Sequence, residues 1–419
     1  MNILIVSPFF PLPLSSGGHT RLFNIIKHLS YRHVVDLISP ITEKEKNHVQ
    51  ELSGFCRNIV TINIDNLYVR EKGYFFRINN YLRLFNRIYC FFKGVPMEIS
   101  GFYYLEMQKK LINLLKNNNY NIVQVELPKM AQNFDKSFYK ENRSLKILVD
   151  YDISFIPYLR NYHCEKKKFL KLKKYIDYRM HRFFALKTWN QFDRLVVMSE
   201  VDRRKVNDIL PELSVHVIPN GVDLASFRPF PKEEGDNRLL FLGGAGHFPN
   251  VDALFYFLKE IFPEIKKRIK KFSVVVIGDC WNRYSDQLPH DASIEFTGFV
   301  KDIRQYINDS TVLITPIRIG GGTRLKIVEA MALKVPVVST SVGCEGFSVE
   351  DGQHILLADK PDDFAIKVQE VFSNKQLYNT LTENAYKLVK ENYGWDKLVL
   401  KLEDIYEYTT EERKMQKAG

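Results

Sequence analysis

No part of the sequence restricts the fold more than residues 312–338, where two apolar runs enclose a glycine-rich turn and a helical segment. The runs at 312–314 and 335–338 predict buried parallel strands, because short continuous apolar segments are typical of sheets covered on both faces. The residue spacing after the glycines, as far as residue 332, predicts a helix between them. Strand, glycine turn, helix and strand form the repeating unit of doubly wound α/β domains.

The turn and the start of this helix have the features of an anion site. Glycines at 320–322 allow the backbone to approach a ligand closely, and Thr323 is the predicted N-cap. Arg324 and Lys326 lie in the first turn, where the helix dipole disfavours cations unless an anion lies between them. Glu329 follows one turn later, within reach of hydroxyl groups. The stretch predicts a diphosphate cradle beside a sugar-hydroxyl acceptor; the alternative is an ordinary αβ loop whose cations face solvent.

The same strand and glycine-turn pattern opens the chain. Residues 2–6 predict a buried strand, and Gly17-Gly18 precede a segment with helical apolar spacing. After a linker rich in proline, glycine and charge at 226–237, the alternation restarts with a strand and a glycine turn that begins at Gly243. We therefore expect an α/β fold of two tandem doubly wound, Rossmann-like domains that face each other across a cleft.

The predicted domains are an N-terminal domain at 1–225, a C-terminal domain at 226–391 and a terminal helix at 392–419. A basic, aromatic helical insertion interrupts the first domain at 66–119. Interleaved aromatics and cations suit a membrane interface or an acceptor groove. The alternative is that the aromatics pack on the domain while the cations face water.

Positive charge is concentrated in one segment. The chain has a net charge of +11, and residues 160–187 carry ten Lys or Arg against two acids, which gives +8. The segment 165–187 predicts a basic helix. Such a surface can meet nucleic acid, anionic lipid or an anionic substrate. No nucleic-acid motif is present, so a nucleic-acid partner is not expected. Two interpretations of the basic segment remain: it binds an anionic membrane surface or substrate, or it is a helix face exposed to solvent.

Two further features bear on location. The sequence has no run of 18 apolar residues, and its start lacks the basic segment of a signal peptide. The five cysteines are scattered without a Cys-x-x-Cys pair, which favours free thiols in a reducing cytoplasm and argues against a zinc site. We expect a cytoplasmic protein, with peripheral attachment to the inner face of the cell membrane.

Several other polar residues follow predicted strands or glycine turns. Asp150 and Asp152 follow a strand at 145–149, and acidic residues at the carboxyl end of a parallel strand face the ligand crevice. Ser199 and Asp202 have the pattern of a structural helix-start box. Asp152 has the same alternative, a structural carboxylate. His19 is as well explained by a solvated loop histidine as by a ligand contact.

Taken together, these motifs resemble those of the retaining glycosyltransferases of family four, which have the GT-B fold. The similarity spans nearly the whole chain and is densest from 219 to 358. It is specific for the superfamily but does not identify the sugar. The resemblance is carried by Gly17-Gly18, Pro219-Asn220-Gly221-Val222-Asp223, Phe241-Leu242-Gly243, Pro249-Asn250-Val251-Asp252-Ala253-Leu254, Phe296-Thr297-Gly298-Phe299-Val300, residues 320–332, Pro336-Val337-Val338 and Gly343-Cys344-Glu345-Gly346.

The resemblance implies nucleotide-sugar binding mainly by the second domain, acceptor binding mainly by the first, and a terminal helix that returns to the first. Glu329 matches the second glutamate of the family's Glu-x7-Glu motif, which binds the ribose, whereas the first glutamate falls at Gly321. The family's diphosphate-binding Arg and Lys follow the turn that here begins at Gly243, and they are absent from it. We therefore assign their role to Arg324 and Lys326 as a prediction.

The resemblance implies a hexosyltransferase that moves sugar from a nucleotide-sugar donor to a surface-polysaccharide (lipopolysaccharide) or lipid-linked glycan acceptor, with retention. No cofactor or metal is expected, although Asp150-Tyr151-Asp152 formally matches the Asp-x-Asp metal motif of the GT-A fold. A sugar-nucleotide 2-epimerase and a non-catalytic GT-B partner subunit are the alternatives. The candidate catalytic residues are Asp152, Arg324 and Lys326, and the candidate donor-binding residues are Gly17, Gly18, Gly243, Gly321, Gly322, Thr323, Glu329 and Glu345.

Overall fold

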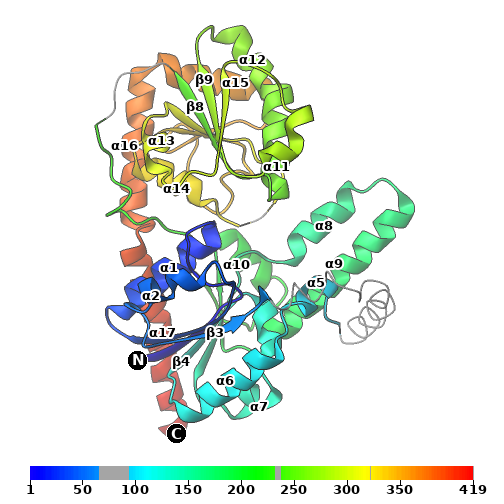
Figure 1. The fold of residues 1–419 in the computed structure, drawn as a ribbon, viewed down its shortest axis with the longest axis vertical. Coiled ribbons are helices and arrows are strands. Elements are labelled where there is room, and N and C mark those ends of the chain that lie inside the picture. Colours follow the sequence, from blue (N-terminus) through cyan, green and yellow to red (C-terminus); the bar gives the residue numbers. More distant parts are fainter. Residues whose placement is uncertain (66–93, 232–236, 321, 419) are drawn as a thin grey trace. The chain divides into compact units, whose positions relative to one another are not determined.

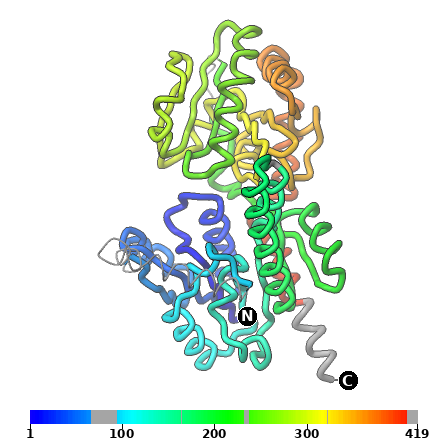
Figure 2. The backbone as a smooth tube through the Cα atoms, turned by 90° about the vertical axis from the view of Figure 1, so that its right-hand side faces the viewer, coloured from blue at the N-terminus to red at the C-terminus, as the bar shows by residue number. Residues whose placement is uncertain are grey.

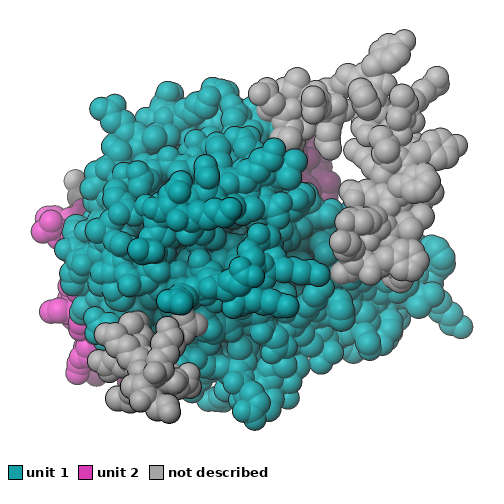
Figure 3. All heavy atoms as spheres, turned by 90° about the horizontal axis from the view of Figure 1, so that it is seen from below, with its two compact units in different colours: residues 1–218, 399–419 teal, residues 219–398 magenta. Residues whose placement is uncertain are grey.

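The protein folds into two compact units, each a parallel sheet with helices packed against it (Figures 1 and 3). The computed structural model describes residues 1–65, 94–231, 237–320 and 322–418. Unit 1 contains Met1–Ile218 and Val399–Gly419, and unit 2 contains Pro219–Leu398, so the chain passes between the units twice. The predicted fold class, two Rossmann-like parallel α/β domains, is confirmed.

The division at 218/219 and 398/399 follows from main-chain hydrogen bonds within unit 2. Val222 N–H donates to the Tyr393 carbonyl at 2.8 Å, and Trp395 N–H donates to the Val222 carbonyl at 3.2 Å. A side chain at Gly221 would also lie 2.7 Å from the Tyr393 carbonyl oxygen. The turn that starts at Pro219 is therefore fixed to the segment around residue 394 and belongs to the second unit.

In unit 1, seven strands of the described residues form one parallel sheet in the order β3-β2-β1-β4-β5-β6-β7. The order reverses at β1, which pairs with β2 on one side and β4 on the other. In doubly wound sheets the ligand crevice lies at such a point, outside the carboxyl ends of the strands. The strands are β1 (Asn2–Val6), β2 (Val34–Ile41), β3 (Asn58–Asn63), β4 (Ile122–Glu126), β5 (Leu145–Val149), β6 (Arg194–Val197) and β7 (Val215–Val217).

Helices cover this sheet, and two of them, α8 and α9, extend beyond it (Figure 1). Residues 66–93 of the predicted insertion lie outside the described part of the chain, and its remainder contains α5 and α6. The helices of unit 1 are α1 (Gly17–Ser30), α2 (Val49–Leu52), α5 (Met97–Ser100), α6 (Leu105–Asn117), α7 (Lys136–Glu141), α8 (Phe155–Cys164), α9 (Lys168–Trp189) and α10 (Glu200–Asn207), with 3₁₀ turns at Lys46–His48 and Pro128–Asn133.

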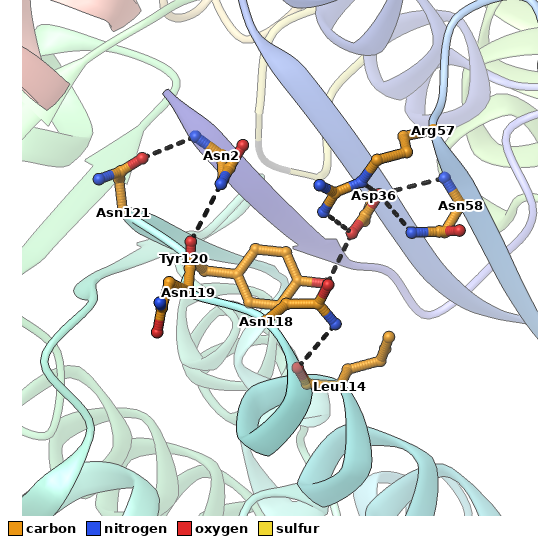
Figure 4. A network of polar contacts seen from close by, with 9 residues as sticks. All are labelled: Asn2, Asp36, Arg57, Asn58, Leu114, Asn118, Asn119, Tyr120 and Asn121. Carbon is orange, nitrogen blue, oxygen red and sulfur yellow. Dashed lines mark hydrogen bonds and ion pairs between the residues drawn. The ribbon is translucent and has the colours of Figure 1, made fainter.

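A buried carboxylate joins the strands of unit 1 near their amino ends (Figure 4). Asp36 on β2 accepts hydrogen bonds from Arg57 Nη2 at 2.6 Å, the Tyr120 hydroxyl at 2.6 Å and the Asn58 main-chain N–H at 3.1 Å. Burial alone would raise the pKa of Asp36, but these hydrogen bonds outweigh it and hold the pKa below its ordinary value. Asp36 is therefore a structural group, remote from the carboxyl ends where ligands bind.

The terminal helix α17 (Trp395–Ala418) begins in unit 2 and belongs to unit 1 from Val399 onward. Within unit 1 its Tyr406 hydroxyl donates to Gln124 Oε1 on β4 at 2.5 Å. Its Glu403 pairs with Arg32 at 2.9 Å and with His33 at 3.0 Å. These polar contacts attach α17, as far as Tyr406, to the rest of unit 1, whose backbone Figure 2 shows from a second side.

In unit 2, six strands of the described residues form a second parallel sheet, in the order β10-β9-β8-β11-β12-β13. The order reverses at β8, which pairs with β9 and β11. The strands are β8 (Arg238–Leu242), β9 (Ser273–Ile277), β10 (Ile294–Gly298), β11 (Val312–Thr315), β12 (Val337–Ser339) and β13 (Leu356–Leu357). The helices are α11 (Phe248–Tyr256), α12 (Phe262–Arg268), α13 (Arg304–Asn308), α14 (Leu325–Ala332), α15 (Pro361–Ser373) and α16 (Lys375–Asn392), with a π-helical turn at Phe257–Ile261 and a 3₁₀ turn at Trp281–Gln287.

Candidate functional site

Two glycine-rich loops of unit 2 follow neighbouring strands at the point where the strand order reverses. The turn that begins at Gly243 follows β8, and the loop at 316–324 follows β11. Since β8 and β11 are parallel neighbours, their carboxyl ends meet at one edge of the sheet. This edge is where a doubly wound sheet binds its ligand.

The glycine turns after β8 and β9 touch through their backbones. A Cβ atom on Gly278, whose φ is +148°, would lie 2.4 Å from the Gly243 carbonyl carbon. A Cβ atom on Gly244 would lie 2.5 Å from Asp279 Oδ1. Trp281 Nε1 donates to the Gly243 carbonyl at 3.0 Å and adds a further contact between the segments that follow β8 and β9. A side chain at Gly244 or Gly278 would collide with the neighbouring turn, so both positions favour glycine.

The loop after β11 enters helix α14 differently from the prediction. Thr323 is not the N-cap; Arg324 is, with an extended φ of −99° and no side-chain capping bond. The Thr323 carbonyl instead accepts a hydrogen bond from Asn220 Nδ2 at 3.2 Å. Gly320 and Gly322 have φ values of +116° and +70°, which favour glycine. Gly321, the predicted position of the missing glutamate, lies outside the described residues.

Two threonine hydroxyls at this edge are buried without a partner. Within the part of the chain that the structure describes, Thr315 Oγ1 at the end of β11 and Thr323 Oγ1 in the loop have no hydrogen-bond partner. Buried hydroxyl groups in native proteins are nearly always hydrogen-bonded, to water or ligand where protein groups do not reach. Two hydroxyl groups without a partner among the described residues therefore lie at the end of β11 and in the loop that follows it.

Lys326 extends from the first turn of α14 back to the end of β8. Its ammonium group donates to the Leu242 carbonyl and lies 5.5 Å from the centre of the Phe241 ring. Burial, with a smaller contribution from the Arg324 charge, lowers the pKa of Lys326 to about 8, while Glu329 opposes the shift. The cation is thus placed next to the glycine turn at Gly243, where the resembled family has its diphosphate cations.

Two more nitrogen-bearing groups share this edge. The Arg324 guanidinium donates to the Gly322 carbonyl. Burial lowers the pKa of His247, and the charges of Lys326 and Arg324 lower it further. His247 had no role in the sequence prediction, although its position at the end of the β8 glycine turn was a signal for one. Arg324 and Lys326 make this edge electropositive and suited to an anion, and their charges favour the neutral form of His247.

Glu329 lies one turn into α14 and is buried. Burial raises its pKa to about 7, and the nearby Lys326 charge limits the shift. At neutral pH the carboxyl group therefore carries a proton in a substantial fraction of molecules and can donate as well as accept a hydrogen bond. Such a group can bind a hydroxyl-rich ligand, and its predicted ribose contact stays a prediction.

Glu345 lies in the loop after β12, beside the same edge. A Cβ atom on Gly343 would lie 2.5 Å from the Thr315 carbonyl oxygen, so this loop packs directly on the end of β11. Burial is the main reason that the pKa of Cys344 rises to about 11, and the Arg324 and Glu345 charges act on it in opposite directions. Cys344 therefore lies within electrostatic range of both side chains.

In unit 1 the first glycine turn is tightly packed. Gly17 and Gly18 begin α1, and a Cβ atom on Gly18 would lie 3.0 Å from Phe9 Cζ. His19 Nδ1 lies 2.6 Å from Ser16 Oγ, and its ring centre is 4.6 Å from that of Phe9. His19 thus lies in the first turn of α1 against Ser16 and Phe9, and burial lowers its pKa.

The two acidic residues after β5, Asp150 and Asp152, lie in different environments. Asp150 is buried and accepts a hydrogen bond from Trp189 Nε1 at 3.0 Å. Burial raises the pKa of Asp150 well above its ordinary value, and the Asp152 charge adds to the shift. Asp152 is half-buried at the same strand end. Among the described residues, no three His, Cys, Asp or Glu side chains are grouped so as to hold a metal ion.

The predicted box at Ser199 is confirmed as a helix cap. Ser199 Oγ accepts from the Asp202 N–H at 3.1 Å and donates to Asp202 Oδ2 at 2.7 Å. Its role is structural.

The structure therefore gathers part of the predicted site within one unit. Gly17, Gly18 and Asp152 belong to unit 1. The other described site residues lie in unit 2, at or beside one sheet edge: Gly243, Gly322, Thr323, Arg324, Lys326, Glu329 and Glu345.

Comparison with solved structures identifies the class of fold. The chain is similar to Anabaena HepE in complex with UDP and glucose, with a TM-score of 0.65, 15% sequence identity, and coverage of 97% of this chain and 100% of that one. Two parallel-sheet Rossmann-like units of this kind constitute the GT-B fold.

Sequence comparison matches one part of the chain to a family model. Residues 236–374, within unit 2, match the family model described as Glycosyl transferases group 1. An uncharacterised glycosyltransferase of Methanocaldococcus jannaschii is 30% identical over 233 residues, 54% of this chain and 62% of that protein. An uncharacterised 44.6 kDa protein in the cps region of Klebsiella pneumoniae is 22% identical over 413 residues, 95% of this chain and 97% of that protein. These matches support a glycosyltransferase of the GT-B fold.

Among the described helices, none has the length and apolar character needed to span a bilayer.

Proposed function

We propose that this chain is a hexosyltransferase that uses a nucleoside-diphosphate sugar and acts on a surface-polysaccharide or lipid-linked glycan acceptor, with retention of configuration. The observation that carries the proposal is the convergence of Arg324, Lys326 and His247 at the shared carboxyl edge of β8 and β11. The similar HepE was solved with UDP and glucose, which favours this donor class. The name of the Klebsiella pneumoniae relative, with its cps region, favours the polysaccharide acceptor.

In this proposal the donor diphosphate lies across the start of α14. The unpaired N–H groups of the helix start and the two cations neutralise negative charge that increases on the diphosphate as its bond to the sugar breaks. Lys326 exchanges its bond to the Leu242 carbonyl for a diphosphate oxygen, or makes both. No metal ion is needed for this charge neutralisation.

The sugar C1–oxygen bond to the diphosphate breaks while a bond forms between C1 and an acceptor hydroxyl oxygen. The acceptor proton passes to the departing diphosphate oxygen, so no strong base is required. Asp152 orients the acceptor or stabilises positive charge on the sugar, Glu329 binds the ribose, and Glu345 binds donor hydroxyls. Backbone N–H groups of the 320–322 loop replace the glutamate that is absent at Gly321.

Isothermal titration of the protein with UDP and UMP, with and without EDTA, tests the donor site. We expect UDP to bind more tightly than UMP, with an affinity that EDTA leaves unchanged. Incubation with nucleotide-sugars, followed by NMR of the anomeric proton, then separates the alternatives. Conversion of the donor without acceptor would indicate the epimerase, and UDP binding with no turnover on any glycan would indicate the non-catalytic subunit.

A further inference from the structure

Helices α8 and α9 form an antiparallel pair that extends from the sheet of unit 1 (Figures 1 and 2). Aromatic rings join them along their length. The rings of Tyr158 and His181 stack with centres 3.7 Å apart, and those of Tyr162 and Tyr175 lie 5.3 Å apart. These contacts use one face of α9, whereas the large apolar side chains on the opposite face are largely exposed.

That opposite face carries large apolar side chains. Phe169 is 81% exposed, Leu172 58%, Ile176 42% and Phe183 55%. Their spacing of three, four and seven residues, at about 100° per residue, places all four within an arc of about 60°. We call Phe169, Leu172, Ile176 and Phe183 the α9 stripe. Exposed apolar residues are ordinary when scattered singly, but a continuous stripe marks an interaction surface.

Cations border the stripe on both sides. Lys168 precedes Phe169, and Lys173 follows Leu172, each about 40° from the edge of the stripe. One of the pair's two acids, Glu165, is ion-paired with Lys174 at 2.7 Å, and the other, Asp177, lies outside the arc of the stripe. The cations of the helical pair and the turn between them are Arg160, Lys166, Lys167, Lys168, Lys171, Lys173, Lys174, Arg179, Arg182 and Lys187.

We infer that the α9 stripe and its flanking lysines dock on an anionic lipid bilayer. An exposed apolar face bordered by Lys and Arg is the pattern of helices that lie in the plane of a membrane interface. Rings and aliphatic chains enter the boundary region, while the ammonium groups remain at the anionic headgroups. The net charge of +8 between 160 and 187 is complementary to the negative charge of an anionic bilayer, and the apolar stripe is complementary to its hydrocarbon boundary.

Charge argues against two other partners for the α9 stripe, a second copy of the chain and the segment 66–93. A second copy of the chain would bring the same +8 segment against itself, and like charges across an interface are costly. The segment 66–93 is itself basic, with six Lys or Arg against one acid, so it is no better matched to this face. An anionic surface matches both segments.

The inference deepens the proposed function, because a lipid-linked acceptor would be presented at such a surface. Vesicle binding itself requires neither donor nor turnover. Membrane docking and donor binding can therefore succeed or fail independently.

Flotation of the full chain with phosphatidylcholine vesicles, with and without phosphatidylglycerol, tests the inference. We expect binding only to the anionic vesicles, weakened by salt. A cation near an anionic bilayer contributes about fivefold to partitioning, so Lys168→Glu with Lys173→Glu should weaken binding by at least about 25-fold. Phe169→Ser with Leu172→Ser should weaken binding by at least about tenfold.

Matched controls use exposed residues elsewhere. Leu400→Ser on α17, where Leu400 is 48% exposed, and Lys375→Glu with Lys390→Glu on α16 should leave vesicle binding unchanged. Circular dichroism and UDP titration in the absence of vesicles check that each variant is folded. The inference is overturned if anionic vesicles do not bind the wild type or if the stripe variants bind as the controls do. It is also overturned if the stripe variants instead change the sedimentation of a dimer.

Discussion

The ammonium group of Lys326 donates a hydrogen bond to the main-chain carbonyl of Leu242, a residue 84 positions earlier in the chain. This contact joins the first turn of α14 to the end of β8, across the strand order reversal of unit 2. It places one cation at both glycine-rich loops. The predictions below test what that cation and its neighbours do.

Removal of this cation should weaken donor binding. Lys326→Met keeps the length and apolar contacts of the side chain but removes its charge. Because a hydrogen bond to a charged group contributes about 1.5–3 kcal/mol, UDP affinity should fall about 10- to 100-fold, measured by isothermal titration. Lys375→Met, at an exposed position on α16, is the matched control and should bind UDP as the wild type does. Equal affinities for the two variants would remove Lys326 from the site.

UDP binding should depend on pH through Lys326. The pKa of Lys326 is lowered to about 8, so the protonated form that binds an anion declines above that pH. From pH 7 to pH 9 the affinity for UDP should fall about tenfold, following the protonated fraction. In Lys326→Arg the charge persists throughout this range. Its titration should therefore show a flat pH profile, and a slope equal to that of the wild type would point to another group.

Stability should respond to pH through Glu329. Its pKa is raised from 4.5 to about 7 in the folded protein, so the folded state keeps a proton that the unfolded state releases. The free energy of unfolding should therefore decrease as pH rises from about 4.5 to about 7, by at most about 3 kcal/mol. Denaturant titrations of Glu329→Gln should lack this decrease. Glu391→Gln, at an exposed position on α16, should retain it.

The backbone contact of the glycine turns should resist even one added carbon. Gly278→Ala would place a methyl group 2.4 Å from the Gly243 carbonyl carbon at a φ of +148°, and should lower stability by about 2–4 kcal/mol. Gly246→Ala lies in the same region, and its added Cβ would meet no atom within 4 Å. The midpoint of denaturant unfolding should therefore move strongly in the first variant and little in the second. Similar midpoints would mean that the two turns separate easily.

The fold was accessible from the sequence because its strands are buried on both faces. Continuous apolar runs such as 312–314 and 335–338 predict parallel strands. The glycines between strand and helix indicate the edge of the sheet where a ligand is expected. That β8 and β11 are neighbours in the sheet could not be predicted from the sequence, because strand order depends on pairing between distant residues. For that reason the direction of Lys326 toward Leu242, and the place of His247 beside it, emerged only from the structure.

The predicted starts of two helices differ from the observed ones, because the local backbone conformation determines where a helix begins. Thr323 has the preferred side chain for an N-cap, but the hydrogen bond from Asn220 to its carbonyl and the extended conformation of Arg324 move the helix start by one residue. The basic segment 165–187 forms one helix as predicted, but α9 starts three residues later, at Lys168, and runs to Trp189. Residues 165–167 separate it from α8, which ends at Cys164, and contain neither glycine nor proline.

Unit 1 is assembled from two stretches of chain that are separated by the whole of unit 2. A ribosome that makes this protein releases the first sheet long before the last helix, which supplies Glu403 and Tyr406 to it. During synthesis the second unit is consequently the earlier one to have all its parts. Until residues 399–406 are made, Gln124 on β4 and Arg32 lack the polar partners that α17 gives them.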